Sequence, residues 1–260
     1  MEWGDDPIHP TAVIHEEAGV PASARIGPYA VIGPGVEIGD EVHVGPHVLV
    51  ERDTRIGARC RLGKGAVLGT DPQDEKYRGE PSRLVIGAGT TVREFATLNR
   101  GSEASGLTRV GEECLIMSYA HVAHDCRIGD RVVLANAVNM GGHVRIGDWA
   151  IVGGVTAIHQ YVRIGEHAFV GGGSRVSQDV APYCTVAGNP PSGYGVNTVG
   201  LERRGFAEES VKALRNAYRR IFRSEERVAP ALDEVEEGDC TPEVAELVRF
   251  VRDSERGVTR

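Results

Sequence analysis

The stretch IGPYAVIGPGVEIGDEVHVG, residues 26–45, carries an aliphatic residue at every sixth position, and glycine follows each one. A helix repeats every 3.6 residues and a half-buried strand every two, so neither produces this spacing. A hexapeptide period is typical of a parallel β-helix, in which three hexads form one triangular coil of about 18 residues. We therefore predict that the aliphatic residues point inward from each side and that the glycines permit the corners.

The six-residue spacing continues through most of the chain. It covers residues 8–68, resumes over 86–98 and resumes again over 110–176. The position four after each aliphatic residue is usually small or β-branched, which suits a narrow interior. The predicted architecture is an all-β solenoid, a parallel β-helix over residues 1–195, followed by an α-helical domain over 196–260.

Two polar segments, 70–85 and 101–109, interrupt the repeat. Both contain glycine, and the first also contains proline, so we expect them to leave the coil as loops. Long polar loops on a rigid scaffold often carry function, although a tolerated surface insertion is the plain alternative, above all for the second loop.

The end of the chain changes from the hexad pattern to a helical one. In AEESVKALRNAYRRIFR, residues 207–223, the apolar residues fall on one helical face. A second helix is predicted to begin with Thr241 as N-cap and Pro242 in its first turn. A β-helix ends in open strand edges, and we expect the two helices to help cover one of them.

Composition excludes several classes of protein. The net charge of −8 argues against general nucleic-acid binding. The acidic start, MEWGDDPIHP, is no signal peptide, and no apolar run reaches the roughly 18 residues of a membrane span. The five cysteines never form a CxxC pair and read as reduced thiols of a cytoplasmic protein: Cys60, Cys114, Cys126, Cys184 and Cys240.

The stretch HVAHDC, residues 121–126, concentrates polar chemistry on this scaffold. Residues 18 apart lie above one another in the stack, so Asp125 meets His143, and IHQY (158–161) lies one coil further. Three readings compete: a metal site, a solvated polar edge, and a general base. His124 as base, Asp125 as its orienting carboxylate and a backbone N–H for an oxyanion would provide the third.

The metal reading can be compared with a known pattern. Gamma-class carbonic anhydrases share this solenoid and bind zinc through three histidines, one of them about two coils before an HxxxxH pair. Position 85, two coils before His121, is valine. No bound metal is therefore expected.

The order and spacing of the motifs resemble the acyl-carrier-protein-dependent UDP-N-acetylglucosamine O-acyltransferases, the family that begins lipid A biosynthesis. The motifs are DPQDEKYRGEPSRL, NRGS, HVAHDC, LANAV, GGHV, VGGVTAIHQY, VGGGSRVSQDV, AGNP and GVNTVGLERRGF. The resemblance implies a left-handed β-helix and a homotrimer with active sites between neighbouring subunits. It implies transfer of a 3-hydroxyacyl chain from the phosphopantetheine thioester of acyl carrier protein to the 3-hydroxyl of UDP-N-acetylglucosamine, without a permanently bound cofactor.

The resemblance also assigns site residues. His124 resembles the general base, Asp125 its partner, and the Gly142 amide the oxyanion donor, while Gly172 matches the position that measures acyl length. Sugar, phosphate or acyl-chain contacts are matched by Gln73, Asp74, Lys76, His121, His143, His159 and Gln160. Nucleotide and phosphate contacts are matched by Asn197, Arg203 and Arg204.

Two positions depart from the family pattern. Val199 stands where an acidic nucleoside contact is expected, and Asn99 where histidine is common. The basic segment 203–227 is the expected docking surface for the carrier protein, which is acidic in this family; an ordinary solvated helix face is the plain alternative.

Alternative functions stay open at this point. A hexapeptide acetyltransferase that uses acetyl-CoA and a non-catalytic solenoid that binds partners share the repeat. A later N-acyltransferase of the same pathway carries a uridine-binding domain, for which the repeat, starting at Ile8, leaves no room. The sequence does not distinguish a 3-hydroxyl from a 3-amino acceptor, and it does not give the acyl length.

Overall fold

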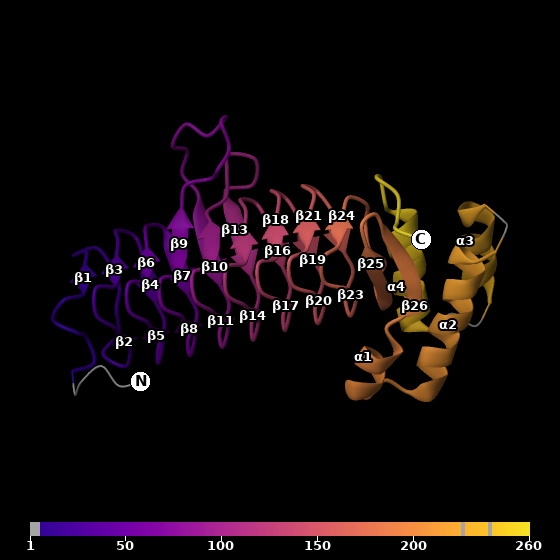
Figure 1. Cartoon of the computed structure of the whole chain (residues 1–260), viewed down its shortest axis with the longest axis horizontal. Helices are drawn as coiled ribbons and strands as arrows, with labels where there is room; N and C mark the ends of the chain where they lie inside the picture. The colour runs from indigo at the N-terminus through magenta and orange to yellow at the C-terminus, as the bar shows by residue number, and fades with distance from the viewer. Residues whose placement is uncertain (1–5, 225–226, 239–240) are drawn as a thin grey trace.

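The computed structural model describes residues 6–224, 227–238 and 241–260. These residues form a long stack of triangular coils with a small group of helices at its C-terminal end (Figure 1). Most strands are only two residues long, and they line up into three flat sheets, one on each side of the stack. The predicted β-helix is therefore confirmed.

The three sheets are called A, B and C here, and the chain visits them in that order in every coil. Sheet A contains β2 (Arg25–Ile26), β5 (His43–Val44), β8 (Arg61–Leu62), β11 (Thr91–Val92), β14 (Leu115–Ile116), β17 (Val133–Leu134), β20 (Ile151–Val152), β23 (Phe169–Val170), β25 (Cys184–Gly188) and β26 (Pro191–Val196). Sheet B contains β1 (Val13–Ile14), β3 (Val31–Ile32), β6 (Leu49–Val50), β9 (Val67–Thr70), β12 (Thr97–Asn99), β15 (His121–Val122), β18 (Asn139–Met140), β21 (Ala157–Ile158) and β24 (Arg175–Val176). Sheet C contains β4 (Glu37–Ile38), β7 (Thr54–Ile56), β10 (Arg83–Ile86), β13 (Leu107–Val110), β16 (Arg127–Ile128), β19 (Arg145–Ile146) and β22 (Arg163–Ile164).

The inward residue of each hexad forms the core. Val31 and Ile32 pair with Leu49 and Val50 in parallel register, and Ile32 is 1% exposed whereas Val31 is 38% exposed. The same alternation recurs along each sheet, so one continuous apolar column fills the prism. In the first described coil the inward position is less covered, and Ile8 is 39% exposed.

The glycines act differently from the prediction. The corner residues with positive φ are mostly not glycine: Asp125, His143 and Tyr161 have φ values of 59°, 63° and 65°. Glycine follows the inward residue because neighbouring coils approach closely there. A Cβ at Gly33 would lie 1.7 Å from the carbonyl oxygen of Glu51 in the next coil.

Both predicted loops leave the same corner, the turn from sheet B to sheet C, here called the B–C corner. The first loop joins β9 to β10 and the second joins β12 to β13. The predicted loop ends were wrong by a few residues, because 83–85 and 107–109 belong to strands. Those strands pair with each other along four residues, starting with Arg83 and Leu107.

The C-terminal end is capped by a hairpin and helices. β25 joins sheet A in parallel and β26 turns back antiparallel to it. The described residues that follow form four helices, not the two predicted: α1 (Thr198–Arg203), α2 (Glu208–Phe222), α3 (Val228–Glu237) and α4 (Pro242–Arg252). Short α1 and α3 were missed because Gly200 and Pro230 weaken their helical pattern.

The C-terminal helices have their own core. Leu214 of α2 and Leu247 of α4 are buried in a second apolar cluster, separate from the core of the coils. The predicted N-cap is confirmed, since the hydroxyl of Thr241 accepts a hydrogen bond from the N–H of Val244. Among the described helices, none is long and apolar enough to cross a membrane.

Candidate functional site

The B–C corner gathers polar side chains from three successive coils. His124 and Asp125 lie between β15 and β16, and Gly142 and His143 lie between β18 and β19. Their rings are in contact, since those of His124 and His143 lie 5.2 Å apart at 89°. One coil further, Tyr161 stacks on His143 with centroids 4.4 Å apart. The strict stack therefore brings these predicted residues together.

His124 and Asp125 form a hydrogen-bonded dyad. Nδ1 of His124 lies 2.8 Å from Oδ2 of Asp125, whose side chain is completely buried. An ionised carboxylate only accepts hydrogen bonds, so the proton of the neutral imidazole lies on Nδ1. Nε2 of His124 then carries a free lone pair and can accept a proton from a substrate.

The second loop positions the carboxylate of Asp125. Ser102 donates from its hydroxyl, 2.6 Å from Oδ2, and from its N–H, 3.1 Å from Oδ1. The hydroxyl of Ser105 also donates to Oδ1. Burial by itself raises the pKa of Asp125, but the hydrogen bonds from His124, Ser102 and Ser105 outweigh it and hold the pKa well below its ordinary value.

Sequence reasoning missed both serines. The loop breaks the 18-residue spacing, so no count of coils connects residue 102 or 105 to Asp125. The NRGS motif, which ends at Ser102, was the available signal, since it is polar and lies beside the predicted catalytic corner. The structure removes the reading of this loop as a tolerated insertion.

The Ser102→Ala/Ser105→Ala variant should lower kcat about tenfold, because losing roughly 1.5 kcal/mol of hydrogen bonding to a charged acceptor loosens the dyad. Losing these two donors raises the pKa of Asp125. A more basic carboxylate holds the protonated dyad more strongly, so the acid limb of the kcat/KM profile should move to higher pH. Ser23→Ala is the matched control, since Ser23 bonds Asp40 far from this corner. An unchanged pH profile in the double variant would remove the serines from the site.

Gly142 packs directly against the ring of His124. A Cβ at this position would lie 2.6 Å from Cε1 of His124, so no other residue fits without displacing the ring. Within the described part of the chain, the N–H of Gly142 donates to no protein acceptor. A free N–H beside the imidazole is the arrangement that an oxyanion requires.

Two further histidines of the site are held neutral. Burial has the largest effect and lowers the pKa of His143. The charges of Asp125 and Asp74 raise this pKa, whereas those of His124 and Arg145 lower it. Burial and then the neighbouring His124 lower the pKa of His121. His121 faces outward on β15, where its Nδ1 lies 2.7 Å from the hydroxyl of Thr97.

The first loop reaches the same corner. The charge of Asp74 acts on His143, while Gln73 and Lys76 are exposed on the loop surface. Arg100 anchors the base of this loop although it is 1% exposed: its guanidinium pairs with Asp71 and bonds the hydroxyl of Tyr77. The NRGS motif thus supports both loops, through Arg100 and Ser102. Nearby, Asn99 donates to Thr70 and the carbonyl of Asp71.

His159 and Gln160 lie on the next coil and are both exposed. Nδ1 of His159 lies 3.0 Å from the carbonyl oxygen of Gln160, and that oxygen also accepts a hydrogen bond from Arg256. Their side chains are free to meet a ligand at the edge of the site.

Other predicted contacts lie at different corners of the same chain. Arg204 donates to the carbonyl of Trp149 and lies 3.1 Å from Nδ1 of His167, and both belong to turns from sheet C to sheet A, the C–A corner. Asn197 caps α1 and donates to the carbonyl of His167, and Arg203 is exposed. Val199 is 59% exposed on α1.

Gly172 lies on the third corner, the turn from sheet A to sheet B, here called the A–B corner. It sits one coil above Gly154, and a Cβ at Gly172 would lie 3.1 Å from the Gly154 carbonyl oxygen. One chain therefore does not bring Gly172, His124 and Arg203 together. The resemblance implies active sites between neighbouring subunits, and residues at separate corners of one chain are compatible with that prediction.

The side chains of this polar cluster are also of the types that bind metal ions. Within the described residues, His124, Asp125 and His143 form the one group whose ligand atoms lie close enough, within 4.8 Å of one another. Both oxygens of Asp125 already accept hydrogen bonds from Ser102, Ser105 and His124. A cation would have to displace those donors, so the arrangement fits a base and its carboxylate better than a metal centre.

Comparison with family models matches two parts of the chain. Residues 17–52 and 107–142 match the "Bacterial transferase hexapeptide (six repeats)" model. Residues 179–259 match the model described as "Udp N-acetylglucosamine O-acyltransferase; Domain 2".

Curated relatives and solved structures match almost the whole chain. The acyl-[acyl-carrier-protein]–UDP-N-acetylglucosamine O-acyltransferase of Chlorobaculum parvum is 57% identical over 252 residues, 96% of each chain. The protein of the same name from Burkholderia vietnamiensis is 44% identical over 97% of this chain and 99% of its own. LpxA of Acinetobacter baumannii superposes with a TM-score of 0.95 at 39% identity, covering 98% of this chain and 100% of its own. The Arabidopsis UDP-N-acetylglucosamine acyltransferase gives 0.83 at 35% identity, with 97% and 100% covered.

Proposed function

This chain belongs to the acyl-[acyl-carrier-protein]–UDP-N-acetylglucosamine O-acyltransferases, and on that premise we propose how its residues perform the reaction. The enzyme transfers a 3-hydroxyacyl chain from acyl carrier protein to the 3-hydroxyl of UDP-N-acetylglucosamine, the first step of lipid A biosynthesis. His124 is the general base, Asp125 orients it, and the N–H of Gly142 stabilises the oxyanion. The left-handed β-helix predicted from the resemblance is the fold of this family.

The observation that carries this assignment is the geometry around one imidazole. Nδ1 of His124 is held by Asp125 at 2.8 Å, and the ring lies against Gly142, whose N–H has no acceptor in the described chain. A base and an oxyanion donor therefore face the same small volume, which is the requirement of acyl transfer.

The reaction then balances without any permanently bound cofactor. The sugar hydroxyl gives its proton to Nε2 of His124 while its oxygen attacks the thioester carbonyl carbon. The carbonyl π pair moves onto oxygen, where the Gly142 N–H stabilises it. The tetrahedral intermediate formed in this way then collapses and its C–S bond breaks. The phosphopantetheine thiolate that leaves takes the proton from the imidazolium. An ester and the carrier thiol are released, and His124 is neutral again.

The remaining predicted contacts fit a site shared between subunits. Sheet A lies between the A–B corner, which holds Gly172, and the C–A corner, which Arg204 contacts beside Arg203. Its outward face is an apolar stripe. The stripe consists of Leu115, Val133, Ile151 and Phe169, paired in register. If a neighbour's B–C corner covers this stripe, its His124 comes between Gly172 on the acyl side and Arg203 on the nucleotide side. We infer a homotrimer with three such sites, a closed symmetry that buries the stripe in every copy.

Family contacts complete the proposal. Asp74, Lys76 and Gln73 on the first loop, with His121, His143, His159 and Gln160, surround the sugar, phosphates and acyl chain. Asn197, Arg203 and Arg204 of the neighbouring subunit contact the nucleotide, since guanidinium groups suit phosphate recognition.

We also propose a cytoplasmic location. Four cysteines are buried free thiols, and Cys240 lies outside the described residues. Burial raises the pKa of Cys60 to about 11 and that of Cys126 to about 12, which keeps them unreactive. Free buried thiols suit a reducing compartment.

The proposed function is tested by mass spectrometry of the acylated product. UDP-N-acetylglucosamine is incubated with 3-hydroxyacyl carrier protein, or with acetyl-CoA, and the product is treated with hydroxylamine. We expect a 3-hydroxyacyl product, formed only with the carrier donor and cleaved by hydroxylamine as an ester. Acetylation, or turnover restricted to a 3-amino sugar with a hydroxylamine-resistant amide, would contradict the assignment.

A further inference from the structure

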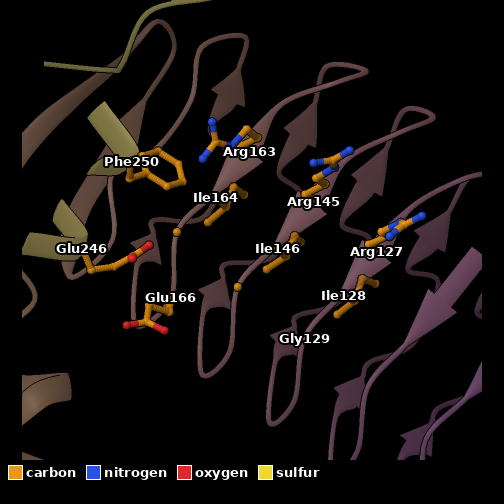
Figure 2. Close-up of a pocket in the computed structure, with 12 residues that line it drawn as sticks. Arg127, Ile128, Gly129, Arg145, Ile146, Arg163, Ile164, Glu166, Glu246 and Phe250 are labelled. Carbon is orange, nitrogen blue, oxygen red and sulfur yellow. The ribbon is translucent and has the colours of Figure 1, made fainter. Parts of the chain in front are cut away.

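Sheet C carries a row of arginines on its outward face. Arg109, Arg127, Arg145 and Arg163 occupy the same position in four successive coils and pair directly in register. Figure 2 shows three of them side by side along the stack, with Phe250 and Glu246 of α4 at one end. Successive coils are about 4.8 Å apart, so the row extends for about 14 Å. These four residues are called the arginine ladder below.

The ladder is electrostatically unfavourable in the isolated chain. Like charges directly opposite each other on neighbouring strands destabilise a sheet. Arg163 is partly satisfied, because it donates to the carbonyl of Asp253 and its guanidinium lies 4.4 Å from the Phe250 ring centroid. Arg109, Arg127 and Arg145 are exposed and have no ion-pair partner in the described part of the chain. Binding of an anionic partner surface would relieve this repulsion between the arginines.

The ladder borders the catalytic corner. Arg127 follows Asp125 by two residues and Arg145 follows His143 by two, so both stand where sheet C leaves the B–C corner. The charge of Arg145 reaches His143 and lowers its pKa, after larger effects of burial and other neighbours. A partner bound on the ladder is therefore beside the site where its acyl group must react.

We propose that the arginine ladder docks an acidic helix of the acyl carrier protein. An α-helix rises 5.4 Å per turn, close to the coil spacing, so acidic side chains one turn apart can meet successive arginines. The proposal rests on the proposed function and names the surface that its donor uses. A carrier held there presents its phosphopantetheine arm to His124 at the adjoining corner.

The basic segment 203–227, predicted as the docking surface, uses several of its guanidinium groups in contacts within the C-terminal domain. Arg220 pairs with Glu234 of α3, Arg215 donates to the hydroxyl of Thr198, and Arg223 donates to the carbonyl of Gly193. These guanidinium groups stabilise the helical domain itself. Lys212 and Arg219 are exposed on α2 and provide the competing surface for the test.

The test reverses two charges of the ladder and compares two donors. Arg109→Glu/Arg127→Glu, at two ladder positions paired in register, should raise the KM for 3-hydroxyacyl carrier protein about tenfold or more, because electrostatic complementarity is lost where the carrier docks. kcat/KM for 3-hydroxyacyl pantetheine and the KM for UDP-N-acetylglucosamine should stay unchanged, since neither uses the ladder. Raising the salt concentration should bring the carrier KM of wild type towards that of the variant by screening.

Two control variants locate the effect. Arg55→Glu makes the same change on the same face of sheet C, on the far side of the loops, where Arg55 pairs with Glu37 at 3.3 Å. It should leave the carrier KM unchanged. Lys212→Glu/Arg219→Glu tests α2. If this α2 variant raises the carrier KM and the ladder variant does not, the carrier docks on α2 and the proposal is overturned.

Failure of the docking surface is distinct from failure of the function. Wild-type turnover with acyl carrier protein is measured in the same series. Its absence overturns the proposed function, whereas normal turnover with an unchanged KM in the ladder variant overturns only the docking surface. A parallel loss with the pantetheine donor would also contradict docking, because the ladder would then act on the small substrates.

Discussion

His124→Ala should reduce kcat by about a hundredfold or more, the usual order for removing a general base. The dyad explains the size of the effect: Nδ1 is committed to Asp125, and Nε2 is the atom left to take the hydroxyl proton. The fold should survive, because His124 occupies a corner and its inward neighbours Val122 and Cys126 hold the coil. The measurement is single-turnover acyl transfer at saturating concentrations of both substrates. The denaturation midpoint of the variant is measured as well, to show that it is folded.

The control for this prediction is a residue of the same type outside the site. His15 lies in the first coils, where its Nδ1 accepts a hydrogen bond from the backbone N–H of Glu17. His15→Ala should turn over like wild type. A folded His124→Ala protein with near wild-type turnover would show that another group is the base.

Gly172→Met should change the preference for acyl length by about a hundredfold. Gly172 and Gly154 present no side chain at the A–B corner, next to the apolar stripe of sheet A. On the proposed function, an extended acyl chain runs along the stack over these two glycines. One coil of about 4.8 Å corresponds to about four methylenes. A methionine side chain that blocks the length of one coil leaves about four methylenes of the longer acyl chain unburied. At about 0.8 kcal/mol for each methylene, the longer donor loses about 3 kcal/mol, or roughly a hundredfold in kcat/KM.

The measurement is the ratio of kcat/KM for 14-carbon and 10-carbon 3-hydroxyacyl carriers. The 10-carbon donor is the internal control, because it corrects for the strain of a Cβ placed 3.1 Å from the carbonyl oxygen of Gly154. Wild type should favour the longer donor and the variant the shorter. An unchanged ratio would show that both glycines only ease the packing of neighbouring coils.

The hexad repeat made the solenoid and its catalytic corner predictable. Inward positions recur every six residues, so the stacking of Asp125 below His143 follows from counting alone. The same count also separates Gly172 from His124, because Val170 and Val122 are 48 residues apart, which is not a whole number of 18-residue coils. A site that uses both residues is therefore one between subunits, as the resemblance implies.

Other features depend on contacts that no period records. Ser102 and Ser105 reach Asp125 from a loop whose length breaks the register, and Arg100 holds the first loop from inside the stack. Their functions depend on the path of the loops. The arginine ladder could have been counted, since its members are 18 residues apart. That three of them have no ion-pair partner among the described residues comes from the structure.

The central claim is that each active site takes its base from one subunit and its phosphate contacts from the next. It is tested by mixing two variants that are inactive for different reasons. His124→Ala lacks the base, and Arg203→Glu repels the nucleotide while leaving His124 intact. Arg203 is exposed on α1, so its replacement spares the fold.

The two proteins are unfolded and refolded together in equal amounts, and acyl transfer is measured at a low concentration of UDP-N-acetylglucosamine. In a cyclic trimer with random assembly, about one quarter of the sites combine an intact His124 with an intact Arg203 from the neighbour. We predict about a quarter of wild-type activity, far above either variant refolded alone. Activity equal to the average of the two separate variants would show that one chain provides both residues, and would contradict the shared site.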